Sequence, residues 1–300
     1  MSQKVLFFEK SALALAISVF SACFARAAEN HVDSLVEEIV ANVAKVKAAD
    51  PGAVPMAFWD FDGTVICGDI TLGHSVDGRV AYDGLFVKAC ENGFSAVLKD
   101  RAAAERFVAV DYPKMGERIG RWLSWPLLGQ VFHGADAAEL ESFSSQYAKT
   151  TLRRWFFSSS IKIMRELEKA GVENYVISGS PDVFVKAAGA EAGIDRLRSL
   201  GIRQRVAGGR LTVQLEYPLS MNEGKVECLR EIMNARPGAR AVAAFGNSYW
   251  TDGPFMRYVV LTPLPGGAKA VALMINGGKP EPGYEGLFRL AEQRETIGGE

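Results

Sequence analysis

The sequence contains few histidines and cysteines and has no excess of positive charge. Its 300 residues include three histidines and four cysteines, and 34 basic side chains stand against 35 acidic ones. His31, His74 and His133 are too scattered along the chain to predict a zinc site. The balanced charge gives no indication of nucleic acid as a partner.

Long hydrophobic runs are also absent. The apolar stretch at residues 13–22 has about half the roughly 20 residues that a membrane-spanning helix needs, so we expect no stable membrane span. It follows Lys4 and Lys10 and precedes Ala25-Arg26-Ala27, which is typical of a signal-peptide cleavage site. We therefore expect residues 1–27 to be a signal peptide and the protein to be exported, in a bacterium to the periplasm. Lipid anchoring at Cys23 is a weaker alternative.

Removal of residues 1–27 would leave Cys67, Cys90 and Cys228. An odd number of cysteines allows at most one disulfide, and the sequence cannot pair them. An export compartment permits such a bridge without requiring it.

The periodicity of apolar residues predicts an α/β protein. An amphipathic helix is expected at about residues 30–48 and a buried strand at 54–59. Residues 70–154 form a mixed segment without strand alternation, which we interpret as a mostly helical insertion. Helices are then predicted at 161–170, 181–192 and 224–234, strands at 173–177, 239–245 and 259–262, and a hairpin within 205–216. This alternation indicates a Rossmann-like parallel sheet with helices on both faces.

Two aspartates follow the first predicted strand directly. Because side chains alternate along a strand, Asp60 and Asp62 are expected on the same side, roughly 7 Å apart. Such a pair could provide a nucleophile and a proton donor, but an aspartate pair at a strand end is often only part of a turn. Ligands of parallel sheets bind at the carboxyl ends of the strands, where Asp60 is placed.

Three further segments carry polar residues at corresponding places. Ser178 ends a strand, and Ser180, Pro181 and Asp182 suit the start of the next helix. Ser220 and Glu223 resemble a capping box, and Lys225 then falls in a first helical turn, where the helix dipole disfavours a cation. A third strand runs into Gly246-Asn247 and, five residues later, Asp252. Each motif alone has an ordinary structural explanation.

Taken together and in this order, the four motifs resemble the haloacid dehalogenase (HAD) superfamily and its phosphoserine phosphatase-like branch. The matching residues are Asp60-Phe61-Asp62-Gly63-Thr64, Ser178-Gly179-Ser180, Lys225, and Gly246-Asn247 through Asp252. The resemblance implies a core formed by residues 28–69 and 155–300, beginning with a helix at 28–50, and a helical cap formed by 70–154. Asn247 departs from the pattern, because an aspartate usually stands there.

The resemblance implies a Mg²⁺-dependent phosphatase acting on a small phosphomonoester. Asp60 would attack phosphorus and form an aspartyl-phosphate, Asp62 would move the proton, and Lys225 would offset negative charge. Ser178 and Gly179 would hold phosphate oxygens, and Asp69 matches an acid that faces the substrate amine. The implied metal ligands are Asp60, Asp62 through its carbonyl, Asp252 and Asn247.

Several alternatives stay open at this stage. The substrate could be an amino-alcohol phosphate such as phosphoserine, phosphocholine or phosphoethanolamine. Aromatic side chains of the insertion either pack a small core or form a cage for a quaternary ammonium; they are Tyr112, Trp122, Trp125 and Phe132. The protein could also bind a phosphorylated ligand without turnover, as Asn247 suggests, or transfer phosphate to an acceptor other than water. Substrate identity and oligomeric state are not predicted.

Overall fold

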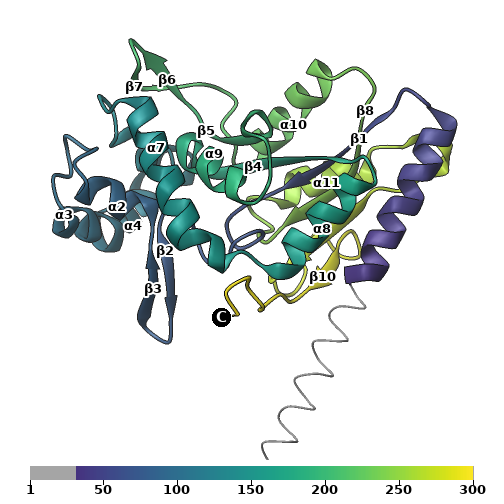
Figure 1. Ribbon diagram of the computed structural model, residues 1–300, viewed down its shortest axis with the longest axis horizontal. Coiled ribbons are helices and arrows are strands. Elements are labelled where there is room, and N and C mark those ends of the chain that lie inside the picture. Colours follow the sequence, from purple (N-terminus) through teal and green to yellow (C-terminus); the bar gives the residue numbers. More distant parts are fainter. Residues whose placement is uncertain (1–31, 300) are drawn as a thin grey trace, which may run out of the picture.

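The computed structural model describes residues 32–299, so the predicted signal peptide and Cys23 lie outside the described residues. A six-stranded sheet forms the centre of the molecule, in the order β10-β9-β8-β1-β4-β5 (Figure 1). All five neighbouring pairs are parallel. Its strands are β1 (Val54–Trp59), β4 (Glu173–Pro181), β5 (Ser199–Ile202), β8 (Ala239–Gly246), β9 (Val271–Ile275) and β10 (Arg289–Ala291).

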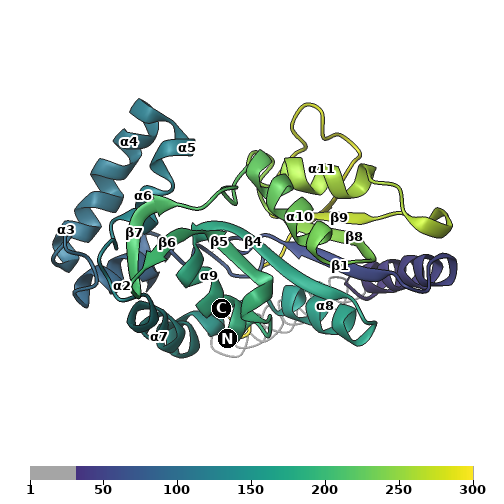
Figure 2. The ribbon, with the colours of Figure 1, turned by 90° about the horizontal axis from the view of Figure 1, so that it is seen from above.

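Helices cover both faces of this sheet (Figure 2). The helix at residues 32–49 lies on one face with α8 (Ser158–Lys169) and α9 (Asp182–Glu191), and α10 (Glu223–Ala235) and α11 (Gly253–Leu261) lie on the other. β1 shows why both faces must be covered. Its residues alternate between the two apolar clusters, with Ala57 and Trp59 in one and Met56 and Phe58 in the other. The predicted α/β fold with a parallel sheet is confirmed.

The chain leaves the sheet after β1 and returns at α8. The intervening segment contains a hairpin, β2 (Gly73–Val76) and β3 (Arg79–Asp83), although no strand was expected there. The hairpin is short and its tip is exposed, and of its strand residues only Tyr82 is buried, so its sequence lacks the alternation that would reveal it. The segment also contains six α-helices: α2 (Leu85–Glu91), α3 (Arg101–Arg106), α4 (Tyr112–Ile119), α5 (Arg121–Ser124), α6 (Leu127–Gln130) and α7 (Ala137–Tyr147).

The two passages between sheet and insert, residues 62–69 and 153–158, lie side by side, and we call them the hinge segments. The Cys67 amide donates to the Trp155 carbonyl at 2.9 Å, and the Phe157 amide to the Val65 carbonyl at 2.8 Å. Residues 295–298 bond to the second hinge segment. The three bonds are Ser158 N–H to Glu295 O (3.0 Å), Ile297 N–H to Phe156 O (2.9 Å) and Gly298 N–H to Arg154 O (2.7 Å).

The hairpin predicted within residues 205–216 is present as β6 (Gln204–Ala207) and β7 (Arg210–Leu215). It reaches the insert, because the Gly134 amide donates to the Leu211 carbonyl at 2.7 Å. The predicted strand at 259–262 is wrong: these residues end α11. β5, β9 and β10 were not predicted. No helix among residues 32–299 is long and apolar enough to span a bilayer, and the three cysteines in that range are free thiols.

Candidate active site

The four polar motifs meet at the carboxyl ends of the central strands. Asp60 directly follows β1, Ser178 and Ser180 lie in the last part of β4, Lys225 lies in the first turn of α10, and Asp252 precedes α11. β1 is hydrogen-bonded to both β4 and β8, so the three strands deliver their ends to one place. Residues separated by up to 165 positions in the sequence are in direct contact there.

Lys225 bridges two of the carboxylates. Its Nζ lies 2.6 Å from Asp60 Oδ1 and 2.7 Å from Asp252 Oδ1. Lys225 and Asp252 are 0% exposed and Asp60 is 5% exposed, so the bridge is shielded from water. Burial by itself lowers the pKa of Lys225, but Asp252 and Asp60 raise it above its ordinary value. The lysine is therefore a permanent positive charge.

Asp252 uses both of its carboxylate oxygens within the protein. Oδ1 accepts from Lys225, and Oδ2 accepts from the backbone amides of Asn247 at 2.9 Å and Ser248 at 3.0 Å. One side chain thus closes the loop that joins β8 to α11 and also holds the lysine.

Asp60 is buried beside one cation, Lys225, and close to two other carboxylates, Asp252 and Asp62. Its Oδ2 accepts a bond from the Thr64 hydroxyl at 3.1 Å. Burial and the neighbouring Asp252 raise the pKa of Asp60 from 3.8 to about 7, although Lys225 opposes the rise. A group in this state takes up either a proton or a cation readily.

Asp62 is held by three hydrogen bonds. Its Oδ2 accepts from the hydroxyls of Ser180 at 2.7 Å and Ser178 at 3.1 Å, and its Oδ1 accepts from the Ile70 amide at 2.7 Å. Burial and the negative charge of Asp69 raise the pKa of Asp62 to about 7, while these bonds oppose the rise. A carboxyl with a pKa near neutrality suits proton transfer in either direction.

The two serines differ from what the sequence suggested. Ser180 was expected to cap the following helix, but Pro181 occupies the N-cap position and the Ser180 hydroxyl turns to Asp62. Ser180 also accepts a bond from the Thr71 hydroxyl at 2.8 Å, which links it to the insert. The pattern Ser178-Gly179-Ser180 contained this signal, because two hydroxyls one residue apart in a strand point the same way.

The segment before Lys225 also departs from the expected capping box. Asn222 is the N-cap of α10, and its side chain accepts the Glu223 amide at 2.7 Å. Ser220 instead donates its hydroxyl to the Ser178 carbonyl at 2.7 Å. This bond joins the second and third motifs directly.

Asp69 lies next to the site but is engaged in a turn. Its Oδ1 accepts the amides of Thr71 at 2.7 Å and Leu72 at 2.8 Å. Burial raises the pKa of Asp69, and those two amides oppose the rise. The acid near the substrate that the resemblance implies at Asp69 is compatible with this placement.

Asn247 packs against Gly63, the residue that follows Asp62. A Cβ added to Gly63 would lie 2.0 Å from the terminal nitrogen of the Asn247 amide. A half-turn of that amide exchanges its nitrogen with its oxygen. Asn247 therefore presents a polar atom beside the Asp62–Gly63 peptide. Among residues 32–299, no group of three or more acidic, histidine or cysteine side chains is placed to hold a metal ion.

The four aromatic residues named in the insert have different surroundings. Phe132 is fully buried and packs edge-on against Phe86 and Phe184, so it belongs to a core. Trp122 is 41% exposed. Tyr112 lies against the Phe107 ring, 6.2 Å centroid to centroid. Trp125 reaches the motifs, where its ring lies 5.5 Å from the ring of Trp250, centroid to centroid, at 65°. The four aromatics named from the sequence do not form one cage.

Comparison with known proteins identifies the family. A family model of the haloacid dehalogenase-like hydrolases matches residues 57–257, more than half of the chain and all four motifs. The chain therefore belongs to the haloacid dehalogenase-like hydrolases, and the superfamily expected from the motifs is confirmed. A comparison with curated proteins found no match.

Solved structures share the fold at low sequence identity. A protein of unknown function from Bordetella pertussis Tohama I has a TM-score of 0.58 at 14% identity and covers 79% of this chain and 98% of its own. A functionally unknown protein from Anaerococcus prevotii DSM 20548 gives 0.54 at 13%, with coverages of 85% and 90%. Cytosolic 5'-nucleotidase IIIB bound to cytidine gives 0.50 at 16%, with coverages of 80% and 77%.

Proposed function

We propose that this protein is an exported, Mg²⁺-dependent phosphatase that hydrolyses a small phosphomonoester through an aspartyl-phosphate. The observation that carries the proposal is the pair of carboxyls at Asp60, which is buried, and Asp62, which is half-buried, each with a pKa near 7 and each held by different partners. Asp60 is bound by Lys225, whereas Asp62 is bound by serines. Two carboxyls in different surroundings suit two different tasks. A dehalogenase, whose aspartate attacks carbon, would need no second carboxyl as a proton donor, so Asp62 favours phosphate chemistry.

In this mechanism, Asp60 attacks phosphorus in line with the leaving oxygen and forms a P–O bond. Asp62 gives its proton to the leaving alkoxide as the bond to that oxygen breaks. Asp62 then takes a proton from water, which attacks the aspartyl-phosphate and releases inorganic phosphate and Asp60. Ser178 and Ser180 keep the Asp62 carboxyl in position for both transfers. Lys225 offsets the charge of the nucleophile and of the phosphoryl group.

The donors around Gly63 fit a hard divalent cation. Oxygen atoms are available from the Asp60 carboxylate, the Asp62 carbonyl and the Asn247 amide, and Mg²⁺ prefers oxygen ligands. Burial raises the pKa values of Asp60 and Asp62, and the neighbouring carboxylates of Asp252 and Asp69 raise them further, so a cation bound there would stabilise the ionised forms. When bound, Mg²⁺ would keep Asp60 ionised and neutralise charge on the transferred phosphoryl group. Since Asp252 already uses both oxygens, we assign the side-chain ligand of its segment to Asn247.

Asp69 supports an amino-alcohol phosphate as substrate. It spends one carboxylate oxygen, Oδ1, on both backbone amides. We propose that the other oxygen faces the positively charged nitrogen of phosphoserine, phosphoethanolamine or phosphocholine. The proposed export rests on the apolar run and cleavage pattern of residues 1–27.

Phosphate release from these three esters and from p-nitrophenyl phosphate, with Mg²⁺ and after chelation, tests the proposal. Turnover that depends on Mg²⁺ and is lost in Asp60→Asn is expected. Asp77→Asn, at the exposed tip of the β2–β3 hairpin, is the matched control and should keep full activity. No turnover by the unaltered protein would refute the enzymatic function. Thermal stabilisation by a phosphomonoester without phosphate release would then favour a binding protein.

A further inference from the structure

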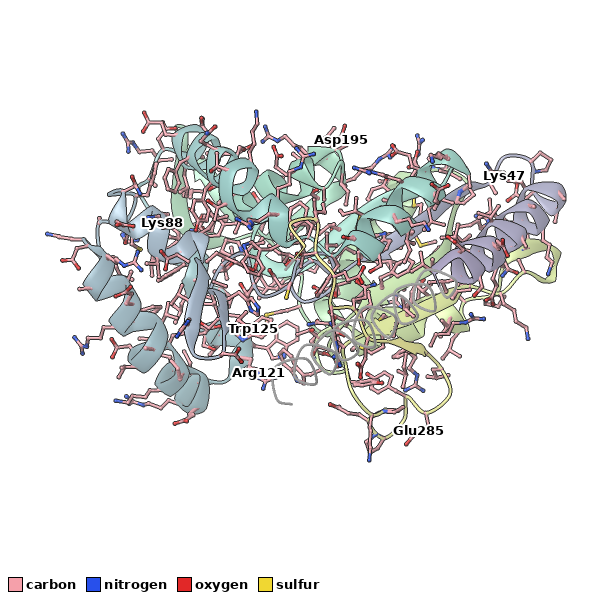
Figure 3. The ribbon with its side chains drawn as sticks, turned by 60° about the horizontal axis from the view of Figure 1, so that its bottom comes forward. Lys47, Lys88, Arg121, Trp125, Asp195 and Glu285 are labelled. Atoms are coloured by element: carbon pink, nitrogen blue, oxygen red, sulfur yellow. The ribbon has the colours of Figure 1, made fainter. Side chains whose placement is uncertain are left out.

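One turn of the insert closes over the proposed phosphate site. This turn begins at Arg121 in α5 and ends at Trp125, four residues later, so both side chains lie on one side of the helix. Figure 3 shows them next to each other, between the insert and the rest of the molecule. The Arg121 guanidinium carbon lies 4.7 Å from the centroid of the Trp250 ring, and Trp125 meets the same ring edge to face.

Trp125 also rests directly on the backbone between the two serines that hold Asp62. A Cβ built on Gly179 would lie 2.7 Å from Cζ3 and 3.0 Å from Cε3 of the Trp125 indole. Gly179 is not among the glycines with positive φ, so its backbone conformation does not require glycine. Glycine is required at this position because the Trp125 indole fills the space that a Cβ would occupy. The absence of a side chain at Gly179 therefore allows Trp125 of the insert to pack directly on this backbone.

Trp250 is fixed to the segment that carries the lysine. Its carbonyl accepts the Asn222 side-chain amide at 2.6 Å, and Asn222 caps the helix of Lys225. The rings of Trp125 and Trp250 also pack on the small apolar cluster of Ile202, Leu219 and Met221. A single turn of the insert thus touches the second, third and fourth motifs at once.

We propose that Trp125 is a specificity-determining residue, which limits the size of the leaving group by closing against Gly179 and Trp250. The inference rests on the proposed phosphatase function and adds a selection by size to it. A leaving group bonded to phosphorus extends from the phosphate site toward the insert, where the indole takes up the space. Compact alkyl leaving groups then fit beneath Trp125, whereas a nucleoside would have to displace it and break its contact with Trp250.

The test compares kcat/KM for phosphoethanolamine, O-phosphoserine and phosphocholine with kcat/KM for the nucleoside 5'-monophosphates. The unaltered protein is expected to favour at least one compact ester over the nucleotides. Trp125→Ala should raise the nucleotide-to-compact ratio by at least tenfold, and Trp125→Leu should do so if the alanine variant folds poorly. Trp122→Ala is the matched control, since that indole lies on the same turn but is 41% exposed. It should leave the ratio unchanged.

A second pair of variants tests the contact with Gly179. Gly179→Ala alone should raise KM for the compact esters severalfold, because the added methyl group prevents Trp125 from closing. Adding Trp125→Ala to Gly179→Ala should restore part of that loss. Rescue is not expected if the methyl group only disturbs the phosphate site, so its absence would count against the proposal.

The outcomes separate the two proposals. Turnover of compact esters with a ratio that Trp125→Ala and Trp125→Leu leave within twofold of the Trp122→Ala value overturns the role of Trp125 but not the phosphatase function. A preference of the unaltered protein for nucleotides also overturns the role of Trp125 and leaves the phosphatase function standing. No turnover of any ester by the unaltered protein overturns both proposals.

Discussion

Lys225 donates to Asp252 across 2.7 Å, and neither residue exposes any surface to solvent. The same ammonium binds Asp60, so it is the shared partner of two buried carboxylates. Asp252 is further held by two backbone amides. This order of attachment, from loop to Asp252 to Lys225 to Asp60, makes the position of the nucleophile depend on the loop that follows β8.

Removal of the ammonium should therefore affect both stability and catalysis. Breaking a buried ion pair by removing one partner costs about 3–5 kcal/mol of unfolding free energy, and Lys225→Met should fall in that range at pH 8. The cost should be smaller at pH 5.5, where the carboxyls can bind protons instead. Urea unfolding measures it. Lys169→Met removes an exposed lysine paired with Glu166 and should change the free energy by about 1 kcal/mol or less. Equal losses in the two variants would contradict the buried bridge.

The stability of the metal-free protein should depend on pH in a direction set by Asp60 and Asp62. Their pKa values are about 7 in the folded protein against 3.8 as the ordinary value, so the folded state binds more protons between these limits. The contribution of these two carboxyls to the free energy of unfolding thus falls as pH rises from 4 to about 7 and is constant above pH 7. In chelator, the melting temperature of the unaltered protein should fall relative to Asp60→Asn between pH 5.5 and 8. An unchanged difference between the two proteins would refute this.

Ser180 should set the pH dependence of the first chemical step. Its hydrogen bond favours the charged form of Asp62, so Ser180→Ala should raise the pKa of that carboxyl further. Asp62 must be protonated to release the alcohol, and the decline of kcat/KM on the alkaline side should move to higher pH. Ser199→Ala removes a buried hydroxyl that bonds elsewhere, to the Asp195 carbonyl, and should leave the profile in place. A shift to lower pH in Ser180→Ala would show that the hydroxyl acts differently.

Asn247→Asp should strengthen binding of the cation at a cost to the metal-free protein. A carboxylate beside Gly63 adds negative charge to a site that already has an excess, so the Mg²⁺ concentration for half-maximal activity should fall severalfold. The melting temperature in chelator should fall for the same reason. Asn92→Asp, at the exposed end of α2, is a control for the Mg²⁺ dependence, which it should leave unchanged. Unchanged Mg²⁺ dependence in Asn247→Asp would exclude residue 247 as a ligand.

The segment that follows Gln293 should stabilise the hinge segments. Its removal deletes three backbone hydrogen bonds to the second hinge segment, each with a net contribution of about 0.5–1.5 kcal/mol. A chain ending at Gln293 should lose about 2–4 kcal/mol of unfolding free energy and become more sensitive to proteolysis between residues 153 and 158. Cleavage there at the rate of the full chain would show that the segment does not support the hinge.

Much of the fold and of the site could be predicted because local patterns coincide with the structure. The run at 54–59 forms β1 as expected, and the carboxyl ends of parallel strands necessarily bring Asp60 and Ser178 to one edge. Lys225 stood out because its place in the first helical turn is unfavourable unless negative charge lies nearby. These features each depend on neighbouring residues in the sequence.

The features that could not be predicted depend on contacts between distant segments. Ser180 satisfies the local rules for a helix cap, and only Asp62, 118 residues away, explains why it does not act as one. Residues 259–262 are mostly apolar or β-branched, yet α11 packs on the sheet and continues to Leu261. The need for glycine at Gly179 follows from an indole 54 positions earlier in the chain, which no local pattern indicates.

The position of residues 295–298 beside the hinge segments has a practical consequence for handling this protein. A purification tag or fluorescent protein fused to the C-terminus would be tethered where the insert joins the sheet (Figure 1). A bulky partner there could hinder opening of the insert and lower turnover without altering any active-site residue.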